Sequence, residues 1–298
     1  MPVRRVRFWR PESTSITHMV RVEGEDRLRV SYGEYFHAVV ILGGSFDGWY
    51  RGMVRTQVPG GLKLKEPGEV HRQVRVHAPF TLEAVAFEPA AVHGAADAMG
   101  LRGSLRFEAS GFAPGTPQAR LAYAMHAALV TPGTPELERE TRIADALAAL
   151  LRGDASSTDA RPERRAPRPV RRARDYLHDA LNEKVTLEEL SRHAGLDKFH
   201  LVRAFKAEVG VPPYEYLVQA RIARARDLLQ RGARVAEAAQ AVGFYDESQL
   251  HRHFRRIVGL APGAFARSLA RPDRTSQHRP IVGRGFDARS AHEETHPN

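Results

Sequence analysis

The chain has 298 residues, a hydrophobic content of 42% and a formal net charge of +10 at pH 7. It contains no cysteine, which excludes disulfides, thiolate zinc sites and cysteine nucleophiles. No run reaches the roughly 18 apolar residues of a transmembrane helix, and the proline-broken, polar start is unlike a signal peptide, so we expect a cytoplasmic protein of about two domains.

The stretch from about residue 3 to residue 112 predicts a β domain. Its short apolar runs end at glycine or proline: residues 38–42 end at Gly43-Gly44, and residues 82–87 end at Glu88-Pro89. Further turns are expected at Pro59-Gly60-Gly61 and at Pro67-Gly68. Evenly spaced short strands with such turns indicate a β-sandwich or a barrel.

A helix pair is expected at about residues 117–152. Thr116-Pro117 and Thr134-Pro135 each supply a capping residue followed by a proline at the first helical position, and the second helix ends near Gly153. The apolar stripes are Leu121, Met125 and Leu129 in the first helix, and Leu137, Ile143, Leu147, Leu150 and Leu151 in the second. The stripes predict burial, but leave open whether the pair covers the β domain or forms a dimer interface.

The positive charge is concentrated in the C-terminal half. Residues 161–270 carry 21 Lys and Arg against 13 Asp and Glu, whereas residues 1–160 carry 19 against 18. Residues 154–170 are rich in proline and arginine and indicate a linker, and the polar residues 271–298 indicate a disordered tail. A basic segment of this kind is what binding to DNA phosphates requires.

Two segments of that basic half, residues 187–213 and 235–262, follow one plan. Asp197, Leu201, Arg203, Phe205, Gly210 and Pro213 align with Asp246, Leu250, Arg252, Phe254, Gly259 and Pro262. Each copy predicts a short helix, a glycine turn and a second helix, which is a helix-turn-helix. The second helix of such a unit enters the DNA major groove.

Cap residues set the expected helix bounds. In the first unit a Thr186/Glu189 capping box precedes a helix at 187–194, and Asp197 caps a helix at 198–209. The helices expected after this unit cover residues 214–230, 235–242 and 247–258, with Asp246 capping the last, and a helix at 171–181 precedes the unit. The long helix between the units is expected to set their spacing.

One face of each second helix is assigned to DNA. The predicted DNA-facing residues are Lys198, Phe199, His200, Val202, Arg203 and Lys206, and then Ser248, Gln249, Arg252, His253, Arg255 and Arg256. Arginine can bind guanine in a bidentate manner and glutamine can bind adenine, whereas Lys206, Arg255 and Arg256 are expected on phosphates. The alternative is a helical bundle with solvated arginines, but two copies in register favour DNA binding.

These residues carry a family resemblance. The sequences GLDKFHLVRAFKAEVGVPPYEYL and AAQAVGFYDESQLHRHFRRIVGLAPGAF resemble the signature of the AraC/XylS family of bacterial transcription regulators, over about residues 170–269. The resemblance implies two recognition helices in adjacent major-groove segments on one face of the DNA. The base-contacting positions that it implies are Phe199, Val202, Arg203, Ser248, Gln249 and Arg252.

The N-terminal half resembles the cupin-like effector-binding domain of the same family, through RFWRP near the start, the Tyr50-Arg51-Gly52 turn and the segment from Pro67 to His71. It departs from metal-binding cupins because it lacks their His-x-His pair. The remaining candidate ligands are Glu69, His71, His37 and His77, which are scattered, so no metal and no other cofactor is expected. The candidate effector-pocket residues are Tyr32, Tyr35, Phe36, Trp49 and His71, with Phe46 beside them.

The sequence therefore predicts an α+β multidomain protein: a cupin-like β-barrel with a helix pair at residues 1–153, a linker at 154–170, and an all-α domain with two helix-turn-helix units at 171–270. We expect a transcription regulator and not an enzyme, with no catalytic residues. Its expected partners are double-stranded DNA, an unknown small-molecule effector and a second copy of itself, with RNA polymerase as a candidate, in the bacterial cytoplasm and nucleoid. Two alternatives remain: a constitutive regulator whose N-terminal half only dimerises, and a cupin-type enzyme fused to a DNA-binding domain.

Overall fold

A computed structural model describes residues 5–11, 16–101, 111–155 and 168–270. The strands are β1 (Arg5–Trp9), β2 (Ile16–Glu25), β3 (Val30–Ser31), β4 (Phe36–Tyr50), β5 (Met53–Gln57), β6 (Leu62–Lys65), β7 (His71–Phe87) and β8 (Gly111–Phe112). The helices are α1 (Pro89–Ala98), α2 (Pro117–Val130), α3 (Glu136–Ala155), α4 (Arg168–Asp179), α5 (Leu187–Ala194), α6 (Lys198–Val209), α7 (Pro213–Gln230), α8 (Val235–Ala241), α9 (Glu247–Val258) and α10 (Pro262–Ala270). The expected order, a β domain, a helix pair and then an all-α part, is confirmed.

The β domain is one antiparallel sheet with the strand order β1-β2-β7-β4-β6-β8, to which β3 and β5 add at β7 and β4. Its two longest strands, β4 and β7, pair along most of their length. The turn predicted at Gly43-Gly44 is wrong, because β4 continues through it with shifts of register. Gly44 has a φ of +69°, and a Cβ there would lie 2.1 Å from the carbonyl oxygen of Pro79. These glycines therefore bend a long strand instead of ending a short one.

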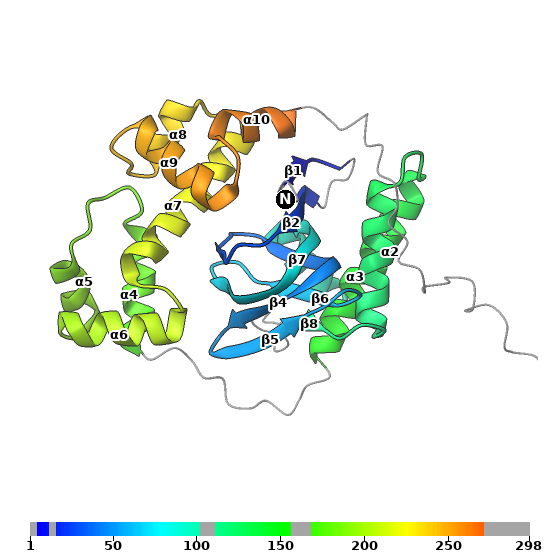
Figure 1. The fold of residues 1–298 in the computed structure, drawn as a ribbon, viewed down its shortest axis with the longest axis horizontal. Coiled ribbons are helices and arrows are strands. Elements are labelled where there is room, and N and C mark those ends of the chain that lie inside the picture. Colours follow the sequence, from blue (N-terminus) through cyan, green and yellow to red (C-terminus); the bar gives the residue numbers. More distant parts are fainter. Residues whose placement is uncertain (1–4, 12–15, 102–110, 156–167, 271–298) are drawn as a thin grey trace, which may run out of the picture.

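The helix pair α2 and α3 covers one face of the sheet (Figure 1). Alternate residues of β4, including Phe36, Ala38 and Val40, pack there with Met125 of α2. The cluster also contains Ile143, Leu147, Leu150 and Leu151 of α3. The stripes left open whether the helix pair covers the β domain or forms a dimer interface. This packing shows that the pair covers the β domain. Leu137, which was expected in the apolar stripe of the second helix, is 76% exposed. Helix α1, which was not predicted from the sequence, adds Val92 to the same cluster.

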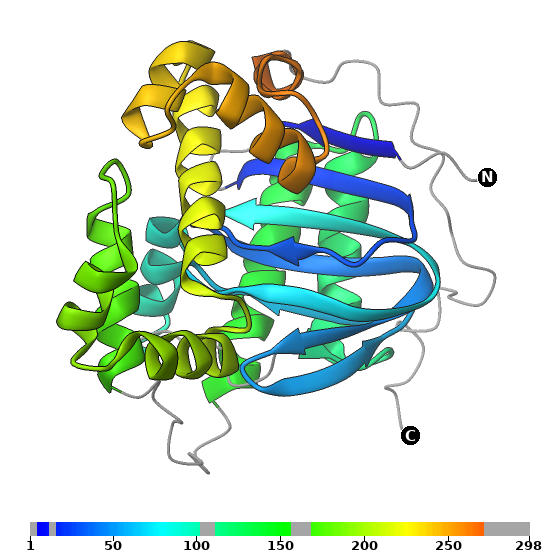
Figure 2. The ribbon, with the colours of Figure 1, turned by 60° about the vertical axis from the view of Figure 1, so that its left-hand side comes forward.

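The C-terminal part consists of two helical units joined by α7, which runs between α4–α6 and α8–α10 (Figure 2). Tyr216, Leu217, Ala220 and Ala223 of α7 pack in the first unit, whereas Ile222, Ala225 and Leu229 pack in the second. Helix α7 thus belongs to both hydrophobic cores. A helix that sets the spacing of the two units, as expected from the sequence, needs such contacts with both. The additional helix α10, not predicted from the sequence, closes the second core with Phe265 and Leu269.

The β domain packs against both helical units on the side opposite to α2 and α3 (Figures 1 and 2). Tyr32 and Val70 join the core of the first unit, and Phe8 joins the core of the second. The ring centroids of Phe8 and Phe265 are 5.0 Å apart, and those of Tyr32 and Tyr216 are 5.4 Å apart. The two halves of the chain therefore share apolar packing.

Some sequence expectations concern residues 156–167 and 271–298, in the linker and the tail, which lie outside the described residues. Helix α4 begins at Arg168, inside the stretch expected to be linker. Among the described helices, none is long and apolar enough to cross a membrane.

Candidate nucleic-acid interface

The first helix-turn-helix unit consists of α5 and α6, and local hydrogen bonds fix its helix ends. Thr186 Oγ1 accepts from Glu189 N at 3.2 Å, and Glu189 Oε2 accepts from Thr186 N at 2.9 Å, so the predicted capping box is confirmed. Gly195 ends α5 with a φ of 70°. Asp197 then accepts from two amides in the first turn of α6, both at 3.0 Å.

The second unit, α8 and α9, repeats this construction. Asp246 accepts from Gln249 N at 2.7 Å and caps α9. Gly243 has a φ of 76°, and a Cβ there would lie 2.8 Å from the backbone of Asn182, which lies between α4 and α5. Glycine is therefore required at this turn both by the backbone conformation and by the close approach of the segment between α4 and α5.

Helix α6 presents the predicted face to solvent. Leu201 and Phe205 are fully buried, whereas Lys198, Phe199, His200, Arg203 and Lys206 are exposed and Val202 is partly exposed. Phe199 is 82% exposed, which is unusual for so large an apolar residue. Lys198 pairs with Glu188 of α5, and His200 contacts Asp197. Arg203 forms no ion pair with any described residue and is available to a ligand.

Helix α9 presents a more basic face. Leu250 and Phe254 are buried, Ser248, Arg252, Arg255 and Arg256 are exposed, and Gln249 and His253 are partly buried. Arg256 pairs with Glu215 of α7 at 3.1 Å. The His253 ring stacks on Phe244, and burial lowers the pKa of His253. This side chain therefore packs partly against the protein and is only partly available on the surface. Tyr245, directly before the cap, is 94% exposed and was not singled out from the sequence.

Both recognition helices end against the β domain. A Cβ on Gly210, the residue that ends α6, would lie 2.3 Å from Cζ3 of Trp49. Arg29 Nη2 donates to the carbonyl oxygen of Ile257 in the last turn of α9, at 3.0 Å. The β domain therefore contacts the C-terminal ends of the two helices whose outer faces are assigned to DNA.

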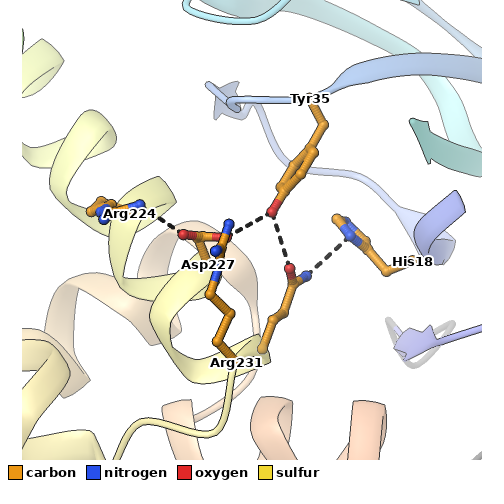
Figure 3. Close-up of polar contacts among 6 residues, drawn as sticks. His18, Tyr35, Arg224, Asp227 and Arg231 are labelled. Carbon is orange, nitrogen blue, oxygen red and sulfur yellow. Dashed lines mark hydrogen bonds and ion pairs between the residues drawn. The ribbon is translucent and has the colours of Figure 1, made fainter. Parts of the chain in front are cut away.

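A polar network joins the β domain to α7 (Figure 3). The Tyr35 hydroxyl donates to Asp227 Oδ1 at 3.0 Å and lies 3.3 Å from Gln230 Oε1. Gln230 Nε2 lies 3.0 Å from His18 Nδ1, and Arg226 Nη2 lies 3.0 Å from His18 Nε2. Burial lowers the pKa of His18 well below its usual value, and Arg226 adds to the effect, so this imidazole is neutral at pH 7.

Asp227 is the charged centre of this network. Asp227 is 4% exposed, and its carboxylate also accepts from Arg224 Nη1 at 2.7 Å and from Arg231 Nε at 3.0 Å. A buried carboxylate needs such donors to compensate for its lost hydration. Asp227 and Arg226 were not predicted from the sequence, because nothing near them in the chain distinguishes them from other charged residues on a helix.

The candidate effector residues lie in different places. Tyr32 and His71 line a cavity between the β domain and the C-terminal helices, together with Phe46, whereas Tyr35 belongs to the network on α7. Phe36 packs on the opposite face of the sheet, under the helix pair, and Trp49 packs on Gly210. The structure thus brings two of the five candidates together at one cavity.

The four scattered candidate metal ligands also have separate surroundings. Glu69 pairs with Arg51 and Arg174, and His77 pairs with Asp47. His37 Nδ1 lies 3.0 Å from the carbonyl oxygen of Tyr35, and the His71 ring stacks on Tyr50. Within the described ranges, no group of three or more such side chains is placed to hold a metal ion.

Comparison with known proteins identifies the C-terminal part. A family model described as a helix-turn-helix domain matches residues 190–268, which span α6 to α9 and most of α5 and α10. The uncharacterized HTH-type transcriptional regulator YbfI of Bacillus subtilis is 38% identical over 76 residues, which are 26% of this chain and 28% of that protein. A protein of Streptomyces antibioticus named as an AraC-like transcription regulator is 37% identical over 97 residues, 32% of each chain. The C-terminal part of this chain is an AraC-type helix-turn-helix domain.

These matches span about a third, or less, of each curated relative. Over most of the chain, the fold resembles a crystal structure of an apo ToxT variant from Vibrio cholerae, with a TM-score of 0.54 and 10% identity, covering 87% of this chain and 100% of that one. At such low identity the likeness concerns the fold alone. It shows that a β domain followed by a helical domain of this kind is a fold found in a solved protein.

Proposed function

We propose that the protein is a DNA-binding transcription regulator in which α6 and α9 enter two successive major-groove segments. The observation that carries the proposal is the pair of capped helix-turn-helix units joined by α7, each with a recognition helix that exposes an arginine at the equivalent position, Arg203 or Arg252. The curated relatives of this domain are named as transcription regulators. This kinship favours regulation over the enzyme alternative.

Within each unit, base reading and phosphate contact fall to different residues. Arg203 and Arg252 project from the outer faces of α6 and α9, where a guanidinium can bind guanine N7 and O6. Lys206 and Arg255 lie further along each helix and suit phosphate contacts, which fix position but not sequence. Phe199 offers an exposed apolar ring of the kind that contacts a thymine methyl group.

We also propose that a small-molecule effector controls the regulator. Support comes from the position of the cavity, which the β domain, Arg226 of α7 and Ile257 of α9 line together. A ligand there would touch both halves of the chain, so its binding energy could alter how the DNA-binding units are held. Homodimer formation, contact with RNA polymerase and a place in the bacterial cytoplasm belong to the same proposal. The domain limits 1–153 and 171–270 also remain a proposal.

The two-unit arrangement can be tested by footprinting and by changing the operator. If α6 and α9 read segments about one helical turn, roughly 10 bp, apart on one face, then inserting about 5 bp between the segments should abolish tight binding. An insertion of the same length outside the two segments serves as the control for length alone. Unchanged affinity after the 5 bp insertion would contradict two-segment reading and would leave one unit as a phosphate clamp.

The constitutive alternative makes a different prediction. A regulator without an effector would show no metabolite that raises its melting temperature, because only a ligand that binds the folded state stabilises it by mass action. A melting screen of the full chain followed by DNA titration with each hit separates the two candidates.

A further inference from the structure

The cavity between the β domain and the C-terminal helices has a volume of about 140 Å³. An apolar cavity of about 150 Å³ engineered in another protein holds one benzene molecule, which sets the size of ligand to expect. Val39, Phe46, Phe80 and Ala84 supply apolar walls, and these side chains form one cluster. The volume therefore suits a compact organic molecule of about five to seven carbon atoms.

One wall of the cavity is the strand β6, whose two faces are both covered. Leu62 and Leu64 point to the helix-pair side and join its hydrophobic cluster. Because side chains alternate along a strand, Lys63 and Lys65 point the other way, and both line the cavity. Lys63 is only 6% exposed, so its ammonium group cannot be fully hydrated by bulk water.

The carboxylates at the cavity are already paired with arginines. Glu25 pairs with Arg29 at 3.2 Å, Glu66 with Arg51 at 2.7 Å, and Glu69 with Arg51 and Arg174, both at 3.4 Å. Lys63, Lys65 and Arg226 form no ion pair with any carboxylate of the described residues. Lys65 donates to Ser31 Oγ at 3.1 Å, and Arg226 reaches the neutral His18, so neither contact supplies a negative charge.

The cavity also contains buried polar atoms that lack partners. His71 is 2% exposed, and neither of its ring nitrogens has a hydrogen-bond partner among the described residues. The Nε atom of Arg226 is likewise buried without an acceptor. Buried polar groups of this kind are rare in folded proteins and indicate a missing partner. The available donors, an imidazole N–H and a guanidinium N–H, both suit an acceptor with negative charge.

We propose that this cavity binds a small organic carboxylate, whose charged group contacts Lys63 and Lys65 of β6, His71 of β7 and Arg226 of α7, and whose apolar body packs on Phe46 and Phe80. The proposal rests on the proposed effector control and names the ligand class of that control. Because Arg226 belongs to the helix shared by both DNA-binding units, the carboxylate would join those units to the β domain. Without an anion, the cations of β6 and α7 repel one another across the same space.

The electrostatics of the lysines agree with the geometry. Burial lowers the pKa of Lys63 to about 7, with the nearby Lys65 adding to the effect, and burial together with Arg226 and Arg29 lowers the pKa of Lys65 to about 8. A bound carboxylate would favour the protonated forms and take up protons on binding. The other titratable or charged groups lining the cavity are Glu25, Arg29, Tyr32, His37, Glu66, Glu69 and Arg72.

The test is calorimetric titration of the full chain with cyclohexanecarboxylate and 3-methylbutanoate, each compared with its uncharged amide. The carboxylates should bind, and each amide should bind at least about tenfold more weakly, as expected for loss of a buried charge-assisted contact. Lys63→Met should weaken carboxylate binding by a similar factor, whereas Lys184→Met, which changes an exposed lysine elsewhere, should not. Equal binding of acid and amide, or binding that ignores Lys63→Met, would overturn the proposal.

Further measurements separate the remaining outcomes. If chloride or phosphate binds as tightly as the organic acids, the site is a simple anion site and the apolar part of the proposal is wrong. Arg226→Gln should weaken carboxylate binding and Arg226→Lys should restore part of it, which a purely structural role of Arg226 would not produce. Hydrogen exchange in α7 should slow when the carboxylate is added and stay unchanged with the amide. DNA binding is measured on the same samples. If the full chain binds DNA but no carboxylate, the ligand class alone is refuted. If it binds neither, the proposed function is refuted as well.

Discussion

The hydroxyl of Tyr35 in the β domain donates a 3.0 Å hydrogen bond to the carboxylate of Asp227 in α7. These residues are 192 positions apart in the chain, and the bond is one of three that Asp227 accepts from side chains. Burial and the negative charge of Asp227 raise the pKa of Tyr35, so the phenol stays protonated and able to donate at physiological pH. The contact fixes the β domain to the helix on which both DNA-binding units are built.

We expect Tyr35→Phe to weaken this junction. Asp227 would keep two arginine donors but lose its phenol partner, and a buried hydrogen bond to a charged group contributes about 1.5–3 kcal/mol. Urea unfolding of the full chain should show a loss in this range. Tyr214→Phe, which changes a tyrosine that is 63% exposed, is the matched control. Equal stabilities for the two variants would show that the Tyr35 bond contributes nothing.

Gly210→Ala should destabilise the protein more than Gly195→Ala. Both glycines end a helix in the left-handed region, at φ values of 89° and 70°, where alanine costs about 1–2 kcal/mol. Around Gly195 a Cβ would meet nothing within 4 Å, whereas at Gly210 it would collide with the Trp49 ring. Overpacking of this kind costs a further 1–3 kcal/mol or so.

A double-mutant cycle tests the cause of that difference. In a Trp49→Ala background, the cost of Gly210→Ala measured by thermal or urea unfolding should fall to that of Gly195→Ala. If the cost stays the same, Trp49 is not the obstacle, and the packing of the β domain on α6 does not explain the requirement for glycine.

Arg203→Ala and Arg252→Ala should each weaken specific DNA binding by about 1–3 kcal/mol and relax base choice at one position. Both guanidinium groups are exposed on the recognition helices. The measurement is a titration against the operator and its single-base variants, with Arg55→Ala, an exposed arginine on β5, as the control. Equal losses on all sequences would mean that the two arginines contact phosphates only.

Lys63→Met should stabilise the free protein at pH 7 and flatten its pH dependence. The pKa of Lys63 is about 7 in the folded chain and about 10.4 in an unfolded one, so between these values the unfolded state binds more protons. The free energy of unfolding of the wild type therefore rises with pH in this window, by about 3 kcal/mol from pH 7 to 9.5 relative to Lys63→Met. Unfolding at several pH values measures the difference, and parallel curves for the two proteins would refute it.

The segment 165–271 should fold and bind DNA by itself, with reduced stability. Its two helical cores are largely complete, but Phe8, Tyr32 and Val70 would be missing from them. Circular dichroism and a gel-shift assay on the segment check this expectation. An unfolded segment would place the domain boundary elsewhere and make the β domain part of the folding unit.

Capping chemistry by itself determined most helix limits of the DNA-binding part. The expected bounds of α5, α6 and α9 agree with the structure, because each depends on partners within four residues: Thr186 with Glu189, Asp197 with the next turn, and Asp246 with Gln249. The outer faces of these helices follow from the same periodicity. Interactions of such short range can be predicted from the sequence alone, and the alignment of the two copies supports each prediction.

Only the tertiary structure decided what the β domain presents to the helical part. The sequence LKLK of β6 would suit an exposed strand edge, and the lysines are internal because Leu62 and Leu64 pack on the helix pair while α7 and α9 border the other side. The partner of Tyr35 likewise comes from a helix far along the chain. The physical reason is that burial and electrostatic environment depend on which elements meet across the fold, and neither periodicity nor capping carries that information.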